Sequence, residues 1–397
     1  MISNEQAEAI IANCDGLLEL EAAFVARDWM TPGRRLGLDE SQYDAGKRGW
    51  VCERWLASTT PASNRIPVEG EGLSFVRTAS GPVQLDELVK AVPSSIMGEE
   101  YAATHSGLGR LAKIFDYGER VPFHIHPPTE QAEALGLNSK DEAYYFLPSS
   151  DLGLHPESFF GVHPSLREEE AADRLVGHLK KWDGDRVLEM SRAYHLYSEG
   201  GYFVPSGVLH APGTALTLEL QEDSDAMAFL QASCGEVLLD KELLLGAFDT
   251  HTQEQIGERA ILDWVDWELN RLADFHSVFH IDPAVISDAE GVEIAWLFWG
   301  GEKFSSKRVR LTPGSSVTLA ENGVYSLLVW TGDVSIGGRR MSGGTPGKDE
   351  LLVTARRAVE GIEYVNTSDV MAEVILFFGP DINPESPIID VPICSNS

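Results

Sequence analysis

Four side chains of the types that bind metal ions occur in strand-like parts of the sequence. They are His124, His126, Glu142 and His210. Because successive side chains of a strand point to opposite faces, the two histidines of the His-x-His run would share one face. Three imidazoles and one carboxylate suit a divalent ion such as zinc, manganese, iron or nickel, and they leave coordination positions open for water or substrate. The sequence therefore predicts one divalent metal ion in a catalytic type of site.

The surroundings of these residues carry the interpretation, because a single histidine among the eleven in the chain is more often a surface residue than a ligand. Glu142 lies sixteen residues after His126 and begins the aromatic run Ala143-Tyr144-Tyr145-Phe146-Leu147. A Pro-x-Gly turn at 205–207 leads to His210 and then to a strand-like run at 215–220. This combination is uncommon by chance, so a metal site is favoured over unrelated polar residues.

The set resembles the metal site of the cupin superfamily, and the sequence from Leu85 to Asp225 resembles the type I mannose-6-phosphate isomerases. The matching motifs extend in order over roughly half of the chain. They are Glu53-Arg54-Trp55-Leu56-Ala57-Ser58, Met97-Gly98-Glu99-Glu100-Tyr101, Leu111-Ala112-Lys113-Ile114-Phe115-Asp116, Phe123-His124-Ile125-His126-Pro127, Lys140-Asp141-Glu142, Tyr202-Phe203-Val204-Pro205-Ser206-Gly207, His210-Ala211, Glu219-Leu220-Gln221 and Ser224-Asp225.

The resemblance implies roles for individual residues. His126, Glu142 and His210 match metal ligands of the family, whereas His124 stands where the family has a glutamine ligand. Three histidines and one glutamate are commoner in other cupins, including metal-dependent oxygenases. The change therefore keeps a second class of enzyme open.

Two further positions match active-site residues of the family, namely Lys140 and Glu219, and the resemblance implies that both are catalytic. The family also has a catalytic arginine ten residues after that glutamate, where this chain has Phe229. An arginine can hold a phosphate through a planar fork of donors, and a phenylalanine cannot. Whether the substrate carries a phosphate therefore stays open.

The implied fold is mainly β, with two cupin-type antiparallel β-barrels of the jelly-roll kind and added helices. The second barrel, in which short strands are separated by Gly-containing turns, has no histidine after His280 and would lack the metal ligands. The N-terminal part, 1–48, is predicted to contain helix and loop, with a helix over 4–28 in which Asn13-Cys14-Asp15-Gly16 is a possible break. A metal-binding barrel follows at 49–235, with a helical insertion at about 155–185 that Ser165 and Glu168 would cap. The remaining parts are a helical connector at 236–290, the second barrel at 291–383 and a tail at 384–397.

The composition narrows the classes of partner. The chain has 397 residues, and its 62 acidic and 31 basic residues give a net charge of −31, which disfavours nucleic acid and anionic membrane surfaces. No apolar run approaches the roughly 20 residues of a membrane helix. The four cysteines, Cys14, Cys52, Cys234 and Cys394, lie far apart without a Cys-x-x-Cys, as expected for reduced thiols in a cytoplasmic protein.

The resemblance implies a metal-dependent aldose–ketose isomerase that acts on a small carbohydrate, either a sugar or a sugar phosphate, through an enediol proton transfer. Zinc is the first choice of metal, with manganese, iron or nickel as alternatives. A cupin oxidoreductase or dioxygenase with a three-His-one-Glu metal, and a sugar-binding bicupin without catalytic activity, are the alternative functions. The sequence does not define the sugar or the oligomeric state, for which a homodimer is one option.

Overall fold

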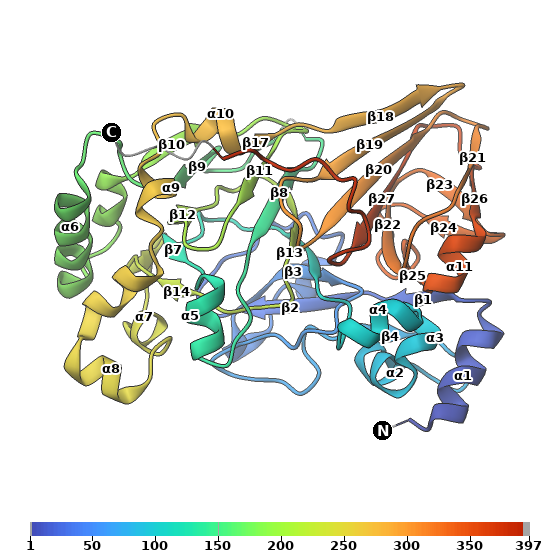
Figure 1. The fold of residues 1–397 in the computed structure, drawn as a ribbon, viewed down its shortest axis with the longest axis horizontal. Helices are drawn as coiled ribbons and strands as arrows, with labels where there is room; N and C mark the ends of the chain where they lie inside the picture. Colours follow the sequence, from blue (N-terminus) through green and yellow to red (C-terminus); the bar gives the residue numbers. More distant parts are fainter. Residues whose placement is uncertain (1, 150, 392–397) are drawn as a thin grey trace.

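The computed structural model describes residues 2–149 and 151–391, and its architecture is mainly β, built from antiparallel sheets with short helices at both ends of the molecule (Figure 1). One half contains a seven-stranded sheet and a five-stranded sheet. The seven-stranded sheet has the spatial order β17 (His280–Ile281), β11 (Gly201–Val204), β8 (Glu142–Phe146), β13 (Thr217–Gln221), β6 (Leu111–Phe115), β3 (Trp50–Leu56) and β2 (Ala23–Arg27). The five-stranded sheet has the order β10 (Arg192–His195), β9 (Glu157–Phe160), β12 (His210–Ala211), β7 (His124–Ile125) and β14 (Ala228–Phe229).

The other half contains a nine-stranded sheet and a four-stranded sheet. The nine-stranded sheet has the order β18 (Ala284–Ala289), β19 (Val292–Phe298), β20 (Ser305–Leu311), β27 (Ala372–Phe378), β22 (Tyr325–Thr331), β25 (Glu350–Val353), β1 (Leu17–Glu21), β4 (Phe75–Val76) and β5 (Val83–Gln84). The four-stranded sheet has the order β21 (Ser316–Leu319), β26 (Ile362–Asn366), β23 (Asp333–Ile336) and β24 (Arg339–Ser342). A separate ribbon pairs β15 (Ser233–Cys234) with β16 (Val237–Leu238).

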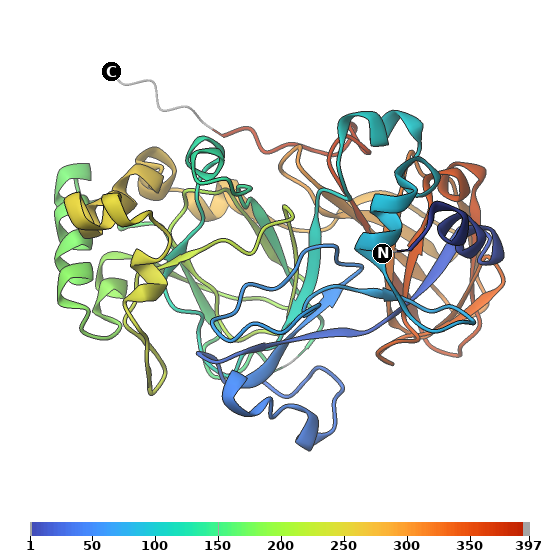
Figure 2. The same cartoon turned by 90° about the horizontal axis from the view of Figure 1, so that it is seen from below.

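Helices gather at the two ends of the molecule (Figures 1 and 2). At the end with the nine-stranded sheet lie α1 (Asn4–Asn13), α2 (Leu85–Ala91), α3 (Pro93–Met97), α4 (Glu99–Thr104) and α11 (Ala355–Glu360). At the other end lie α6 (Glu168–Lys181), α7 (Glu242–Leu245), α8 (Thr250–Gln255), the 3-10 helix η4 (Gly257–Trp264) and α9 (Trp267–Arg271). The remaining helical segments are α5 (Thr129–Ala134), α10 (Phe275–Phe279), η1 (Glu40–Gln42), η2 (Gly46–Arg48) and η3 (Arg186–Met190).

The five-stranded sheet has two different faces because its side chains alternate. Phe123, Ile125 and Leu209 are fully buried in one apolar cluster with Leu175 of α6 and Ile261 of η4. The residues between them in sequence, which include the predicted histidine ligands, therefore point away from the helices. Helix packing on one face thus orients the histidines on the other.

The predicted helix over 4–28 is wrong beyond Asn13. Residues 17–21 form β1 in the nine-stranded sheet, and residues 23–27 form β2 in the seven-stranded sheet. The helix ends because Asp15 and Gly16 take positive φ angles of 49° and 68°. A Cβ on Gly16 would lie 2.4 Å from the Thr354 hydroxyl, so only glycine lets the chain turn this close to its neighbour. The segment therefore contributes one strand to each half.

Other predicted boundaries also shift. The chain at 157–160, expected in the helical insertion, is strand β9, and the helix itself covers 168–181. Arg167 rather than Ser165 precedes that helix, because the Ser165 hydroxyl bonds to the His163 ring instead. The expected connector at 236–290 already includes β18, which pairs with β19 along an antiparallel hairpin.

Within the described residues no helix has the length and apolar character needed to cross a membrane. Cys14, Cys52 and Cys234 carry free thiols. Cys394 lies outside the described residues, as do positions 392–397 of the predicted tail.

A buried ion cluster joins the two halves. The Arg54 guanidinium on β3 bonds to both oxygens of Asp349, at 2.6 and 2.8 Å, and to Glu350 of β25 at 3.1 Å. Glu350 also accepts a hydrogen bond from the Ala57 amide at 2.6 Å. Burial raises the pKa of Glu350 to about 7, although Arg54 and the amide oppose the shift. The Arg54 guanidinium therefore pairs with two buried carboxylates, and the Glu350 carboxyl is partly protonated near pH 7.

This cluster predicts a pH-dependent stability that Glu350→Gln removes. The folded state keeps the Glu350 proton up to about pH 7, whereas the unfolded chain releases it near its ordinary pKa of 4.5. Since the folded state binds more protons in this window, its stability falls as pH rises. Between pH 4.5 and 7.5, the free energy of unfolding of Glu350→Gln should rise by on the order of 3 kcal/mol relative to that of the wild type. Denaturant unfolding at both pH values measures this, with exposed Glu360→Gln as the control; a constant difference would contradict it.

Candidate metal centre and active site

Four buried side chains from two sheets meet in one group. His124 on β7 and His210 on β12 face each other across the five-stranded sheet, His126 follows β7, and Glu142 begins β8 of the seven-stranded sheet. Their ligand-type atoms all lie within 4.8 Å of one another. The structure thus brings together all four of the predicted ligands, and within the described residues it is the one group of this kind.

The turn before His210 is held by the connecting helix α9. Asn270, which is fully buried, donates to the Gly207 carbonyl at 2.7 Å and accepts from the Leu209 amide at 2.8 Å. Gly207 has a φ of 82°, and a Cβ there would lie 2.9 Å from the Trp264 carbonyl oxygen. The Pro-x-Gly run therefore turns tightly against the helices before it enters β12 with His210 pointing at the other ligands.

Each histidine is oriented by a backbone carbonyl. The Nδ1 atoms of His124, His126 and His210 lie 2.8, 2.7 and 2.8 Å from the carbonyl oxygens of Pro122, Ala226 and Val208, respectively. Since a carbonyl can only accept, these contacts assign the proton to Nδ1 and leave Nε2 as a lone-pair donor. This is the second contact that metal-binding histidines usually make.

The arrangement of the Nε2 atoms fits a cation. Nε2 of His210 is buried and has no hydrogen-bond partner among the described residues, and it lies 2.8 Å from Oε1 of Glu142. Nε2 of His126 lies 3.3 Å from Oε2 of the same carboxylate. With the assigned tautomers, these contacts place lone pairs opposite a carboxylate, which is favourable only when a positive charge lies among them. The donor set therefore suits a divalent ion.

The pKa shifts of these side chains favour the protonation states needed for metal binding. Burial, and then the neighbouring His210 and His126 rings, hold the pKa of His124 well below its usual range. Burial and the Lys140 ammonium lower the pKa of His126 to about 3. For Glu142, burial acts upward, but Lys140 and the imidazoles outweigh it and hold the pKa well below its usual range. Neutral imidazoles and an ionised carboxylate are the forms that bind metals.

The two predicted catalytic side chains lie directly beside this group. Lys140 Nζ is 2.9 Å from Oε2 of Glu142, 3.4 Å from Oε1 of Glu219 and 3.2 Å from Nε2 of His126. A second lysine, Lys113 of β6, approaches the other oxygen of Glu219 at 3.2 Å. All these side chains are at most 4% exposed. An ammonium and a carboxylate thus share the interior face with the metal-type ligands.

Burial and the neighbouring charges determine the protonation of Glu219 and Lys140. It raises the pKa of Glu219 to about 7, against the opposing effect of Lys113 and Lys140. Burial also acts to lower the pKa of Lys140, but the carboxylates of Glu142 and Glu219 outweigh it and raise the pKa. The lysine therefore keeps its proton, and the glutamate is close to the point at which it can exchange one.

A second ion cluster lies farther along the same sheet. Arg27 of β2 bonds to Glu53 at 2.6 Å and to Asp225 at 3.1 Å. Glu53 also accepts hydrogen bonds from Tyr117 and Trp55, each at 2.7 Å. Arg27 and Lys113 were not predicted as site residues from the sequence. A charged residue in an apolar strand, as in Leu111-Ala112-Lys113-Ile114-Phe115, is the sequence signal that could have identified them.

Phe229 occupies the place where the resemblance predicts an arginine. Its ring centroid lies 6.0 Å from that of His124 and 5.0 Å from that of Trp29 in an edge-to-face contact. The side chain is 2% exposed, and β14 pairs it directly with His124. An apolar ring therefore lies against His124 at the position where the resemblance predicts an arginine.

Removal of one ligand should abolish metal binding. We expect His210→Ala to lose bound metal after dialysis, because one of the four donors disappears and Glu142 loses its nearest imidazole. Metal analysis of the purified variant measures this, together with the shift in melting temperature on adding zinc. His163→Ala is the matched control, since His163 is exposed and its ring bonds to Ser165, away from the four ligands. Full metal occupancy in His210→Ala would contradict the assignment.

No protein-family model and no curated protein matches the chain. Solved structures do match its fold. The mannose 6-phosphate isomerase from Bacillus subtilis is 17% identical with a TM-score of 0.60, and the alignment covers 91% of this chain and 99% of that one. A zinc-bound mannose 6-phosphate isomerase is 12% identical with a TM-score of 0.61, and a variant of phosphomannose isomerase from Salmonella typhimurium is 11% identical with a TM-score of 0.61. Both alignments cover 92% of this chain and 100% of the other. The resemblance noted in the sequence is thus confirmed for the fold.

Proposed function

We propose that this protein is a metal-dependent aldose–ketose isomerase that acts on a sugar or sugar phosphate through an enediol. The observation that carries the proposal is the placement of Lys140 and Glu219 within 3.4 Å of each other and beside the His–Glu group. The fold shared with solved mannose 6-phosphate isomerases supports it.

In this proposal the metal ligands are His124, His126, Glu142 and His210. When bound, a divalent ion polarises a carbonyl oxygen and stabilises negative charge on neighbouring oxygens. We favour zinc, which does no redox chemistry and accepts nitrogen and oxygen ligands, while manganese, iron or nickel would fit the same donors. A zinc-bound structure among the similar folds supports this choice.

The chain's own residues then handle protons. Isomerisation of an aldose moves one proton from C2 to C1 and one from the C2 hydroxyl to the C1 oxygen, so no atom is gained or lost. A group that removes the carbon-bound proton must also return it to the neighbouring carbon. Lys140 and Glu219 are the proton-transferring pair that we propose, and the Lys113 ammonium positions Glu219 by holding its second oxygen. Burial of the pair excludes water from the exchange.

We further propose that the sheets form two cupin-type barrels. The first would combine the seven-stranded and five-stranded sheets, largely from residues 49–235, and the second the nine-stranded and four-stranded sheets, largely from residues 284–383. The placement of the ligand group between the first two sheets supports this division. The second barrel would be structural.

Lys140→Met separates metal binding from turnover. The variant should keep its metal, because removal of the ammonium takes away a positive charge that repels the ion, and it should lose isomerisation by at least about 100-fold, as expected for loss of a proton-transfer group. Metal analysis and an anaerobic assay on mannose, fructose, lyxose, xylulose and the 6-phosphates of the two hexoses measure both. Lys90→Met, an exposed lysine on α2, is the control.

The same assay separates the candidate classes. Turnover in the wild type without oxygen supports the isomerase, and a fully active Lys140→Met variant would remove this lysine from the mechanism. Oxygen consumption with no isomerisation would favour a cupin oxidoreductase, for which the three-His-one-Glu set is common. Absence of both activities in the metal-loaded protein would leave a binding protein.

A further inference from the structure

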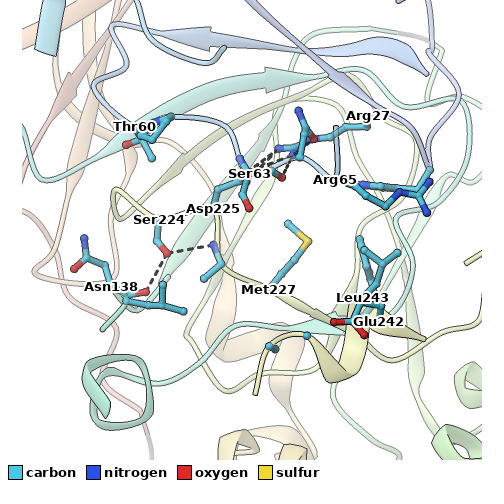
Figure 3. Close-up of a pocket in the computed structure, with 18 of the residues that line it drawn as sticks. Arg27, Thr60, Ser63, Arg65, Asn138, Ser224, Asp225, Met227, Glu242 and Leu243 are labelled. Carbon is cyan, nitrogen blue, oxygen red and sulfur yellow. Dashed lines mark hydrogen bonds and ion pairs between the residues drawn. The ribbon is translucent and has the colours of Figure 1, made fainter. Parts of the chain in front are cut away.

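A cavity of about 580 Å³, with lining residues drawn in Figure 3, includes Phe229, whose ring contacts that of His124. Its walls come from β2, the loop at 60–65, the loop at 136–138, the segment 223–229 and helix α7. The volume is within the range of small-ligand pockets. Figure 3 shows Arg27, Ser63 and Asp225 grouped on one wall, with Met227 reaching into the middle of the view.

Two residues that line the cavity also contact the metal-type ligands. Phe229 and Ala226 both line it. The ring of Phe229 contacts the His124 ring, and the carbonyl of Ala226 holds Nδ1 of His126. The metal ligands themselves are at most 3% exposed, so a molecule in this cavity would approach them along these two residues.

The charges that line the cavity are mostly negative. The lining includes four carboxylates, Asp28, Asp223, Asp225 and Glu242, against two guanidiniums, Arg27 and Arg65, and it contains no lysine or histidine. A phosphate ester brings two more negative charges near neutral pH. Like charges in a partly enclosed space repel each other more strongly than in open water. The cavity therefore disfavours a phosphorylated ligand unless a guanidinium is free.

Arg27 is not free. Its Nε and Nη2 donate to Glu53 at 2.6 and 3.1 Å, and Nη2 also donates to Asp225 at 3.1 Å. Its Nη1 donates to the Ser63 carbonyl at 3.2 Å, to the Asn64 amide oxygen at 3.0 Å and to Asp225 at 3.2 Å. All three nitrogens are therefore committed, and the side chain is 3% exposed. A phosphate could bind here only if these bonds were broken.

Arg65 is also paired. Its Nε and Nη2 both donate to Oδ2 of Asp28, although the Arg65 side chain is 63% exposed at the edge of the cavity. At the inner end, where the resemblance predicts a catalytic arginine, Phe229 offers no charge at all. Neither end of the cavity therefore provides an unpaired cation for a phosphate.

From these contacts we propose that the cavity admits an uncharged, non-phosphorylated sugar and discriminates against its phosphate ester. The inference deepens the proposed isomerase function and rests on it for the reaction. Sugar hydroxyl groups can donate to the lining carboxylates and accept from amides such as Asn138, and the partly exposed Met227 and Leu243 side chains offer an apolar surface to carbon-bound hydrogens.

Binding of hexitols tests this without relying on turnover, because a hexitol has no carbonyl group to isomerise. Calorimetric titration of the metal-loaded full chain with mannitol and with mannitol 1-phosphate should give at least tenfold tighter binding of mannitol. The ratio should shrink as salt is raised, because salt screens the repulsion. Equal or tighter binding of the phosphate would overturn the proposal, as would failure of mannitol to bind. If the protein prefers mannitol but catalyses no isomerisation, the proposed isomerase function is contradicted and the proposed ligand preference is not.

Asp28→Asn tests whether the cavity can be made to bind a phosphate ester. The substitution frees the Arg65 guanidinium and removes one carboxylate, so the affinity for mannitol 1-phosphate relative to mannitol should rise at least tenfold. Asp369→Asn, at an exposed turn of the other half, is the matched control and should not change the ratio. An unchanged ratio in Asp28→Asn would contradict the role assigned to the lining charges.

Discussion

The structure depends on how it balances a row of buried charges along the interior of one sheet. The row begins with Asp225, Arg27 and Glu53 and continues through Lys113, Glu219 and Lys140 to Glu142. Ions this deeply buried are tolerated only when they are paired and hydrogen-bonded. Three cations face four carboxylates, so one negative charge is left over. A proton on Glu219 can offset it, as its pKa of about 7 indicates, and a divalent ion at the histidines would reverse the balance.

This balance explains why the ligand group spans two sheets. The histidines come from the five-stranded sheet, whose opposite face is fixed by the helices, and the carboxylate comes from the sheet that carries the charged row. Neither sheet alone brings both donor types together. The metal-type group therefore forms where an apolar packing constraint and an electrostatic constraint meet.

Much of this was predictable from local sequence. The spacing of His124 and His126 correctly predicted that both side chains share one face. The mainly β architecture was implied by the resemblance, and the short strands of the second half also followed from apolar runs separated by turn residues. These features depend on neighbours within a few positions, which a single sequence displays directly.

The features that sequence reasoning missed depend on distant partners. Arg27 ends an apolar strand-like run, which indicates a buried charge, but its partner Asp225 lies 198 positions away and the local sequence does not identify it. The separation of β1 from β2 into different sheets likewise requires knowledge of β25 and β3. Helical periodicity over 4–28 was misleading because apolar residues in two short buried strands can mimic the spacing of one helix face.

The half of the molecule without ligands still acts on the site through Lys303. This lysine, in the turn between β19 and β20, reaches Ser139 at 3.0 Å and Glu222 at 2.9 Å. Glu222 in turn accepts from the Asp141 amide at 2.8 Å. Lys140 lies between Ser139 and Asp141, so its backbone is held on both sides by contacts that end on the other half. The same Asp141 accepts from the amide in the Pro-x-Gly turn before His210. The half whose described residues form no metal-type group thus fixes the segment on which the candidate catalytic lysine lies.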